Sequence, residues 1–320
     1  GRKRRFRCWT ALQDQLHTCA SASRTAAIIA AATACRTAAL KSARTRTSVL
    51  WKSCATWPPR RSGAASKKIR VTGGEPLVRR GAVDFCRMLS SIAGVEELCV
   101  TTNGSLLKEV ARPLRDAGVT HLNISLDTLN EERFRAITRL GTLQDTLDGI
   151  EAAERAGFAK IKLNCVLLGG VNDDEIADFV DLTREHPWQV RFIERMPMGC
   201  GKDFGTYLPS QAVLDRCPEL EAVSHDGVAA CYRLPDAKGT VGLIAPMSHA
   251  FCAECSRIRI TADGKLKPCL HSDAEITLRG LSGEELEQAI RRGILMKPER
   301  HHMDEIGVTE THRGMFAIGG

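Results

Sequence analysis

The sequence predicts an α/β fold in which a mostly parallel sheet is curled as a barrel. Between residues 69 and 194, short apolar runs typical of strands alternate with longer runs that have helical periodicity. Such alternation is typical of parallel sheets, because each strand must be joined to the next by a crossover, usually a helix. Polar residues follow every strand-like run, and in barrels of this kind the carboxyl ends of the strands carry the chemistry.

The elements follow in order along the chain. The expected strands are Ile69–Thr72, Leu98–Thr101, Leu122–Leu126, Ile161–Val166 and Val190–Glu194. The expected helices are Leu77–Ile92, Leu106–Ala117, Glu131–Ile137, Leu143–Ala156 and Asp174–Glu185. From Asp203 to about Ala245 the signal fades, and only short helix-like or strand-like pieces are indicated.

Length and composition restrict the class of protein. The chain has 320 residues, enough for a sizeable core, and no apolar run reaches the roughly 18 residues of a membrane span. Its 13 cysteines, without a clear secretory signal, favour a reducing, cytoplasmic location with some thiols held for metal. The net charge of +7 comes from residues 1–66, which hold 13 Lys and Arg and one acid, Asp14, and so carry +12, whereas the rest of the chain carries −5. The rest of the chain has no basic stripe, which argues against nucleic acid as a partner.

Residues 1–66 are rich in Ala, Arg, Ser and Thr and show no lasting helical or strand period. Three interpretations compete. A transit peptide has this Arg- and Ser-rich, acid-poor composition, and a disordered basic arm is the simplest reading. The third is translation in a shifted reading frame, which would make this an aberrant copy of the first barrel unit.

The shifted frame can be tested on the sequence itself, by joining the third base of each codon to the first two bases of the next. Ala26-Ala27, Ala30-Ala31 and Thr33-Ala34 then permit cysteine, and the run that begins at His17-Thr18 can read YLRLSLTDRCNYRCRYCMP. Trp51-Lys52 must read Glu. The translation in the shifted frame contains Cys-x3-Cys-x2-Cys and continues into the printed sequence near Lys67. We therefore favour a compensated frameshift.

The stretch from Lys67 to Arg80, KKIRVTGGEPLVRR, organises the rest of the chain. Gly73 and Gly74 follow a strand, where the absence of a Cβ lets the backbone turn sharply and approach a ligand. A carboxylate at that turn, Glu75, can receive an ammonium group. Each polar strand end alone is more often a turn or a helix cap. Five polar strand ends on one edge of the sheet indicate a site. Besides Gly73-Gly74-Glu75, these strand ends are Thr101–Gly104, Ser125–Asp127, Lys162 with Asn164, and Glu194–Met196.

A cysteine cluster follows in residues 251–269, FCAECSRIRITADGKLKPC. Cys252 and Cys255 share one tight loop, and a hairpin that turns at Asp263-Gly264 brings Cys269 back. Such thiolates suit zinc, with His271 as a fourth ligand, or an iron–sulfur cluster with one iron free for a substrate atom. Arg257 and Arg259 alternate beside them, as a polyphosphate clamp or as a solvated strand face.

Together these motifs resemble the GTP 3',8-cyclases of molybdenum cofactor biosynthesis, which are radical S-adenosylmethionine enzymes. The resemblance covers residues 67–320. It rests on KKIRVTGGEPLVRR, TTNG, NISLDTL, ITR, GVNDDEI, RFIERMP, FCAECSRIR with Cys269, and a terminal Gly-Gly. TGGEP alone would indicate only the superfamily, whereas the last motifs are specific to the cyclase.

The resemblance implies an incomplete (βα)6 barrel over residues 67–245, closed on its open side by a cluster-binding and GTP-binding region over residues 246–320. It implies a [4Fe-4S] cluster on Cys252, Cys255 and Cys269, and contacts to S-adenosylmethionine from Gly73, Gly74, Glu75, Ser125 and Met196. The implied contacts to GTP are Arg70, Thr101, Lys162, Arg257, Ile258 and Arg259, and the implied aids to cyclisation are Gly319 and Gly320.

In such enzymes a 5'-deoxyadenosyl radical takes a ribose hydrogen from GTP, and the ribose carbon then attacks C8 of guanine. The resemblance further implies a downstream enzyme of the pathway as a partner, allows a homodimer, and requires no membrane. One departure is serious, because the Cys-x3-Cys-x2-Cys of the first cluster is absent from residues 1–66 as printed. We therefore expect this polypeptide to be inactive, with the strand Ile69–Thr72 left as an uncovered edge. A non-catalytic GTP-binding relative is the main alternative, and a radical peptide-modifying enzyme is a weaker one.

Overall fold

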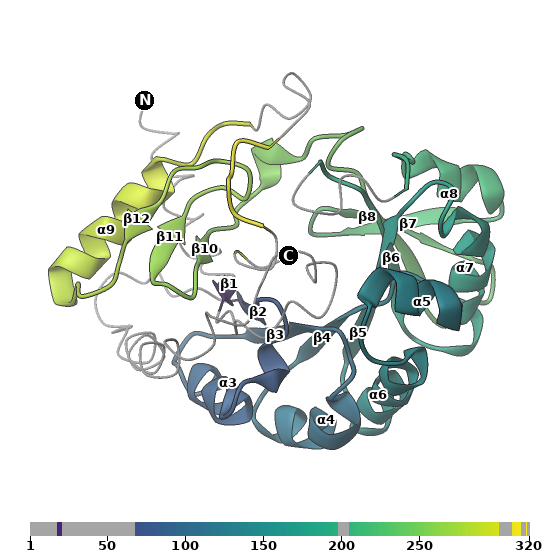
Figure 1. Cartoon of the computed structure of the whole chain (residues 1–320), viewed down its shortest axis with the longest axis horizontal. Coiled ribbons are helices and arrows are strands. Elements are labelled where there is room, and N and C mark those ends of the chain that lie inside the picture. The colour runs from purple at the N-terminus through teal and green to yellow at the C-terminus, as the bar shows by residue number, and fades with distance from the viewer. Residues whose placement is uncertain (1–17, 21–67, 198–204, 301–308, 315–317, 319–320) are drawn as a thin grey trace.

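The computed structural model describes residues 18–20, 68–197, 205–300, 309–314 and 318. Within this part, one sheet of twelve strands has the order β12-β11-β10-β1-β2-β3-β4-β5-β6-β9-β8-β7. Figure 1 shows its central strands as an arc, with helices α3 to α7 on the outer side of the curve. This arrangement confirms the predicted α/β class with a mostly parallel sheet.

The predicted alternation of strands and helices is confirmed. The central parallel strands are β2 Lys68–Thr72, β3 Glu97–Thr102, β4 His121–Ser125, β5 Lys160–Leu167 and β6 Gln189–Glu194. The helices between and after them are α3 Ala82–Ser90, α4 Leu107–Asp116, α5 Glu131–Thr138, α6 Leu143–Arg155 and α7 Ile176–Glu185.

The expected helix Leu77–Ile92 is the main departure in this region. The chain forms a 3-10 turn, η2 Pro76–Val78, and α3 begins only at Ala82. Gly81 lies between them with a φ of 81°, a left-handed conformation that interrupts a right-handed helix. A second 3-10 turn, η3 Asp173–Glu175, precedes α7.

The expectation that β2 would be an uncovered edge is wrong. A short strand, β1 Thr18–Ala20, pairs in parallel with β2 and joins it to β10, so that Cys19 lies opposite both Val71 and Ile260. Unpaired backbone groups at a sheet edge are costly, and even three residues of extended chain satisfy several of them. The competing interpretations of the rest of residues 1–66 lie outside the described residues.

The part of the chain with a weak sequence signal extends the sheet. After α8 Gln211–Arg216, the strands β7 Glu221–Asp226 and β8 Ala229–Arg233 form an antiparallel hairpin, and β9 Thr240–Ile244 pairs in parallel with β6. At the opposite end of the sheet, β10 Arg259–Ile260, β11 Lys265–Lys267 and β12 Ile276–Thr277 are antiparallel. The predicted hairpin around Asp263-Gly264 is thereby confirmed.

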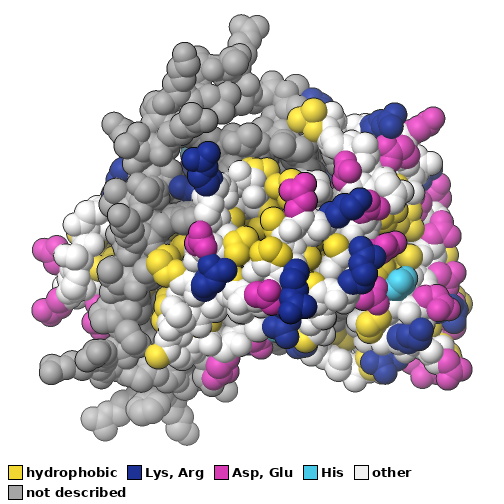
Figure 2. All heavy atoms as spheres, turned by 90° about the horizontal axis from the view of Figure 1, so that it is seen from below, with side chains coloured by type: hydrophobic (Ala, Val, Ile, Leu, Met, Phe, Trp, Pro, Cys, Tyr) yellow, Lys and Arg dark blue, Asp and Glu magenta, His cyan; other side chains and the backbone are white. Residues whose placement is uncertain are grey.

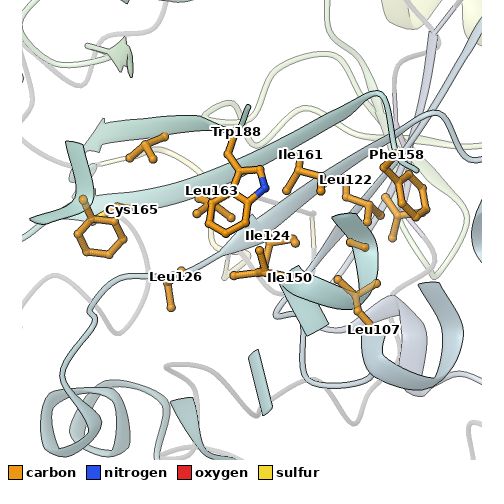
Figure 3. Close-up of a cluster of buried hydrophobic side chains, with 14 of the residues drawn as sticks. Leu107, Leu122, Ile124, Leu126, Ile150, Phe158, Ile161, Leu163, Cys165 and Trp188 are labelled. Carbon is orange, nitrogen blue, oxygen red and sulfur yellow. The ribbon is translucent and has the colours of Figure 1, made fainter. Parts of the chain in front are cut away.

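Alternation along the central strands separates an apolar face from a polar face. The apolar set packs against the outer helices in one core, which contains Ile69, Val71, Leu98, Val100, Leu122, Ile124, Ile161, Leu163, Val190 and Phe192. Figure 3 shows part of this core, where Leu122, Ile124 and Leu163 of the sheet meet Ile150 and Leu107 of the helices. Burying each such side chain contributes roughly 1.5–3 kcal/mol, which fixes the register of the strands.

The opposite side of the same strands is polar, and we call it the inner face. Its members are Arg70, Thr72, Thr101, Asn123, Ser125, Lys162, Asn164 and Arg191, which alternate with the core residues. A separate small core packs α9 Gly283–Leu295 onto β10–β12 through Ile258, Leu266, Ile276, Ile290 and Ile294. Across the described residues, no helix combines the length and the apolar character needed to cross a membrane.

Candidate active site on the inner face of the sheet

Strand register sorts the predicted binding residues into two layers. Thr101, Asn123 and Lys162 are direct neighbours across β3, β4 and β5. One pleat nearer the carboxyl ends, Ser125 and Asn164 are neighbours, and Arg191 of β6 comes next in the same row. The residues implied to bind GTP and the residue implied to bind S-adenosylmethionine therefore lie in adjacent rows of one surface.

Glu75 lies at the carboxyl end of β2 and is buried, with 2 % of its surface exposed. Its Oε1 accepts hydrogen bonds from the Leu77 amide at 3.0 Å and the Thr102 hydroxyl at 2.9 Å, and its Oε2 accepts from the Asn103 amide at 2.7 Å. Burial raises the pKa of Glu75 although these three hydrogen bonds oppose the rise. The carboxylate thus joins the Gly-Gly turn to the end of β3, and Gly73, with a φ of 154°, permits that turn.

Other acids at the strand ends are also engaged by the protein itself. Asp127 accepts a hydrogen bond from the Val166 amide at 2.8 Å, and burial raises the pKa of its carboxyl group to about 6. Glu194 receives the Ser210 amide at 2.9 Å on one oxygen and the Met247 and Ser248 amides at 3.1 and 2.9 Å on the other. Each acid joins the end of its strand to a neighbouring segment, which is β5 for Asp127 and two loops for Glu194, and Glu194 in this way anchors the segment that carries Met196.

Bases dominate the inner face itself. The buried side chains of Lys162 and Arg191 both contact Oδ2 of Asp226, at 2.5 Å from Nζ and 2.7 Å from Nη2. Arg191 lies across Gly242, where a Cβ would come within 3.2 Å of the arginine Cγ, so the missing side chain makes room for it. Burial and the Arg191 charge lower the pKa of Lys162, whereas its contact with Asp226 opposes that effect.

Three arginines continue this positive surface toward β10. The charge of Arg70 acts on both Arg191 and Arg259, and burial together with the Arg257 charge lowers the pKa of Arg259 to about 10. The Arg257 guanidinium lies 5.2 Å from the centre of the Phe251 ring. Among the described residues, three buried polar atoms on or beside this surface have no hydrogen-bond partner, namely Asn123 Oδ1, Asn164 Oδ1 and Arg257 Nε. Buried polar atoms are normally paired, so these atoms are suited to a ligand.

The charges on the outer helices are arranged differently. Lys108 pairs with Asp148 at 2.7 Å and Arg112 pairs with Asp116 at 3.0 Å, both on exposed surfaces. Figure 2 shows bases and acids interspersed over this face. Unlike the cluster on the inner face, these bases are balanced by nearby acids.

The three predicted cluster ligands lie near the arginines but do not form a closed group. Cys252, Cys255 and Cys269 are all of intermediate exposure, and a 3-10 turn begins at Cys252 and ends just before Cys255. Burial alone would raise the pKa of Cys255, but Arg257 and Lys297 more than offset it and lower the value to about 7. Thiolates favoured in this way are suitable ligands for an iron–sulfur cluster. Still, in the described part of the chain no three Cys, His, Asp or Glu side chains converge closely enough to hold a metal ion.

The segment 309–314 is held to the β10–β12 region by an ion-pair network. Arg313 pairs with Asp263 at 2.8 Å and with both oxygens of Glu275, and Glu275 also accepts from Lys265 at 2.9 Å. The predicted aids to cyclisation, Gly319 and Gly320, lie outside the described residues. Ile258, another predicted contact, has its side chain in the small core, so only its backbone is available to a ligand.

Sequence reasoning missed two members of this site. Arg191 lies between two core residues of β6, Val190 and Phe192, and that alternation was a usable signal that it faces the opposite side. Asp226 had no such signal, because it is 64 residues from Lys162 in the chain and reaches it only through the β7–β8 hairpin.

Comparison with known proteins agrees with this geometry. The sequence signature described as Radical SAM superfamily matches residues 61–183, and the one described as Molybdenum Cofactor Synthesis C matches residues 188–303. The structure of SuiB from Streptococcus suis bound to S-adenosylmethionine is similar, with a TM-score of 0.58 and 14 % identity, over 95 % of this chain and 71 % of that one. A partial barrel with this signature defines the class as a radical S-adenosylmethionine protein.

Closer relatives specify the family. A GTP 3',8-cyclase of Peptoclostridium acidaminophilum is 48 % identical over 261 residues, which cover 79 % of this chain and 80 % of that protein. One of Alkaliphilus oremlandii is 43 % identical over 265 residues, covering 81 % and 83 %. One of Pseudomonas putida is 46 % identical over 270 residues, covering 80 % and 81 %. The chain belongs to the GTP 3',8-cyclase family.

Proposed function

We propose that the inner face binds GTP and that the reaction of this site is the cyclisation of GTP in molybdenum cofactor biosynthesis. The observation that carries the proposal is the concentration of bases on one polar surface, the buried Lys162, Arg191 and Arg259 and the half-buried Arg70, with unpaired polar atoms beside them. A triphosphate carries enough negative charge to offset the cost of burying these cations. Thr101 on the inner face and Arg257 beside it complete the proposed contacts.

S-adenosylmethionine is proposed to lie at the carboxyl ends of the strands, against Gly73, Gly74, Glu75, Ser125 and Met196. When bound beside a [4Fe-4S] cluster, it supplies the radical that removes a hydrogen from the ribose. The protein residues hold and orient the two ligands in adjacent layers. Because both oxygens of Glu75 already accept hydrogen bonds from the protein, its proposed role includes fixing the Gly-Gly backbone that faces the ligand.

A second [4Fe-4S] cluster is proposed on Cys252, Cys255 and Cys269. Arg257 and Lys297 favour the thiolate form of Cys255, as such a cluster requires. With only three protein thiolates, such a cluster would offer an open iron site to the guanine end of the substrate. Gly319 and Gly320 are proposed to assist cyclisation, and the network around Arg313 holds the segment that precedes them.

We further propose that the chain as printed lacks activity, because residues 1–66 offer no Cys-x3-Cys-x2-Cys. The position of β1 supports the frameshift interpretation. In the shifted frame the codons of residues 18–20 belong to the run YLRLSL, in which leucines alternate with polar residues before the cysteines, and residues 18–20 occupy the place of a first barrel strand. A nucleotide read across these codons tests it. Two compensating changes would support the interpretation, whereas an intact frame would favour a non-catalytic GTP-binding relative.

Titration calorimetry with GTP tests the binding site directly. Lys162→Ala is expected to weaken binding at least about tenfold, since a buried charged contact to phosphate is lost. Lys108→Ala is the matched control, because Lys108 pairs with Asp148 on the outer helices. Equal affinities for the two variants would exclude the inner face as the GTP site. A cytoplasmic location, a downstream pathway enzyme as partner and a homodimer complete the proposal.

A further inference from the structure

Asp226 lies where the sheet brings a distant hairpin to the inner face. It is the last residue of β7 and pairs with Ala229 across the turn into β8. One of its oxygens, Oδ2, accepts hydrogen bonds from both Lys162 and Arg191, at 2.5 and 2.7 Å. The carboxylate therefore binds the same two cations that a phosphate group of the ligand would need.

Exposure distinguishes the acid from its partners. The side chains of Lys162 and Arg191 are 11 % and 8 % exposed, whereas that of Asp226 is 38 % exposed. The acid is thus the member of the triad that can turn toward solvent without burying a new charge. Asp226 lies at the end of a hairpin, next to Gly227 with a φ of 63°, and therefore at the edge of the sheet.

We propose that Asp226 is a built-in counter-anion that a polyphosphate ligand displaces from Lys162 and Arg191, so that it limits binding to strongly anionic ligands. This inference rests on the proposed GTP site. The carboxylate stabilises two buried cations in the free protein and competes with the ligand for their N–H donors. Its removal therefore has effects of opposite sign on stability and on affinity, which a purely structural residue would not produce.

The opposite signs follow from the charges. Without the carboxylate, Lys162 and Arg191 lose their shared counter-charge and repel each other, Arg191 also repels Arg70, and the free protein is destabilised. A bound polyphosphate restores the pairing and no longer meets a carboxylate beside its own oxygens. Close charge pairs of this kind change affinities strongly, and we expect a gain of about tenfold for Asp226→Asn.

The test compares Asp226→Asn with wild type and with Asp148→Asn, an equal charge change at the Lys108 pair on the outer helices. Calorimetry with GTP and with inorganic tripolyphosphate measures affinity, and thermal unfolding with and without each ligand measures stability. We expect Asp226→Asn to unfold at a lower temperature when free, to bind both ligands about tenfold more tightly and to show a steeper loss of affinity with salt. Asp148→Asn should match wild type.

Equal or weaker binding by Asp226→Asn would overturn the inference, and so would a gain that Asp148→Asn reproduces. The same experiment tests the proposed GTP site separately from the role of Asp226. If wild type binds tripolyphosphate but not GTP, the nucleotide site is refuted, while the tripolyphosphate data still decide the role of Asp226. If no variant binds either ligand, both proposals fail.

Discussion

Glu75→Gln is the substitution that most directly probes how the strand ends are held together. Glutamine has nearly the same shape as glutamate, so the packing around residue 75 is kept while one acceptor becomes a donor. In wild type, three donors from Leu77, Thr102 and Asn103 point at the carboxylate, at 3.0, 2.9 and 2.7 Å. Either orientation of the amide places its NH2 group against at least one of these donors.

The expected loss of stability is worked out for the orientation of the glutamine amide that keeps more hydrogen bonds. The amide oxygen keeps the contacts with Leu77 and Thr102, and the buried Asn103 amide loses its acceptor. A hydrogen bond to a charged group contributes about 1.5–3 kcal/mol, and an unsatisfied buried donor costs about 1–3 kcal/mol. Because burial also raises the pKa of Glu75, loss of its buried charge returns part of this cost. We expect a net loss of about 3 kcal/mol in the free energy of unfolding.

Urea denaturation without cofactors measures this loss as a shift of the midpoint at an unchanged slope. Glu109→Gln, on the exposed surface of α4, is the control and should change stability by less than about 0.5 kcal/mol. If Glu75→Gln behaves like this control, the three hydrogen bonds do not support the strand ends, and Glu75 is instead a residue that serves the ligand alone.

The remaining predictions concern a pH effect, the terminal segment and a tight contact. Burial lowers the pKa of His121 from 6.5 to about 4, so the unfolded chain takes up the proton first and stability falls as pH drops through that window. His121→Asn should remove this loss, about 1–2 kcal/mol for a half-buried ring, in denaturation midpoints from pH 7 to pH 4. Arg313→Ala should cost about 1–2 kcal/mol and speed amide hydrogen exchange in residues 309–314, with Arg313→Lys only partly restoring protection because it lacks the planar fork. Gly149→Ala should cost about 2 kcal/mol or more in thermal or urea unfolding, because its Cβ would lie 2.2 Å from the Gly104 carbonyl oxygen.

Each of these three has a clear contrary result. A wild-type stability that is flat between pH 6.5 and 4 would mean that the charges around His121 cancel the effect of burial. Only the charges of Glu97 and Asp226 act in that direction, because Lys160 and Lys162 lower the pKa of His121 as burial does. Unchanged exchange in residues 309–314 after loss of Arg313 would show that the segment is held by other contacts. A neutral Gly149→Ala would show that α6 can move away from the turn after β3.

Acids and bases at the strand ends divide into two roles. Glu75, Asp127 and Glu194 accept hydrogen bonds from backbone amides of neighbouring segments, as the turn and cap interpretation of isolated polar strand ends suggested. Lys162 and Arg191, by contrast, lie on the inner face, where the sole carboxylate contacting both among the described residues is Asp226. The acids position the backbone at the strand ends, and the bases are the contacts that we propose for an anionic ligand.

The sequence by itself determined the alternation of strands and helices and the residues on each face of the central strands. Both follow from local periodicity, which burial on one side of a sheet imposes on every strand. It also singled out Gly73-Gly74-Glu75, Lys162 and the three cysteines of residues 252–269 as candidate site residues, and these roles stay predictions. Only the tertiary structure placed β1 beside β2 and Asp226 against Lys162. Those contacts join segments far apart in the chain. The order and curvature of the sheet bring these segments together, and no local sequence pattern predicts either of them.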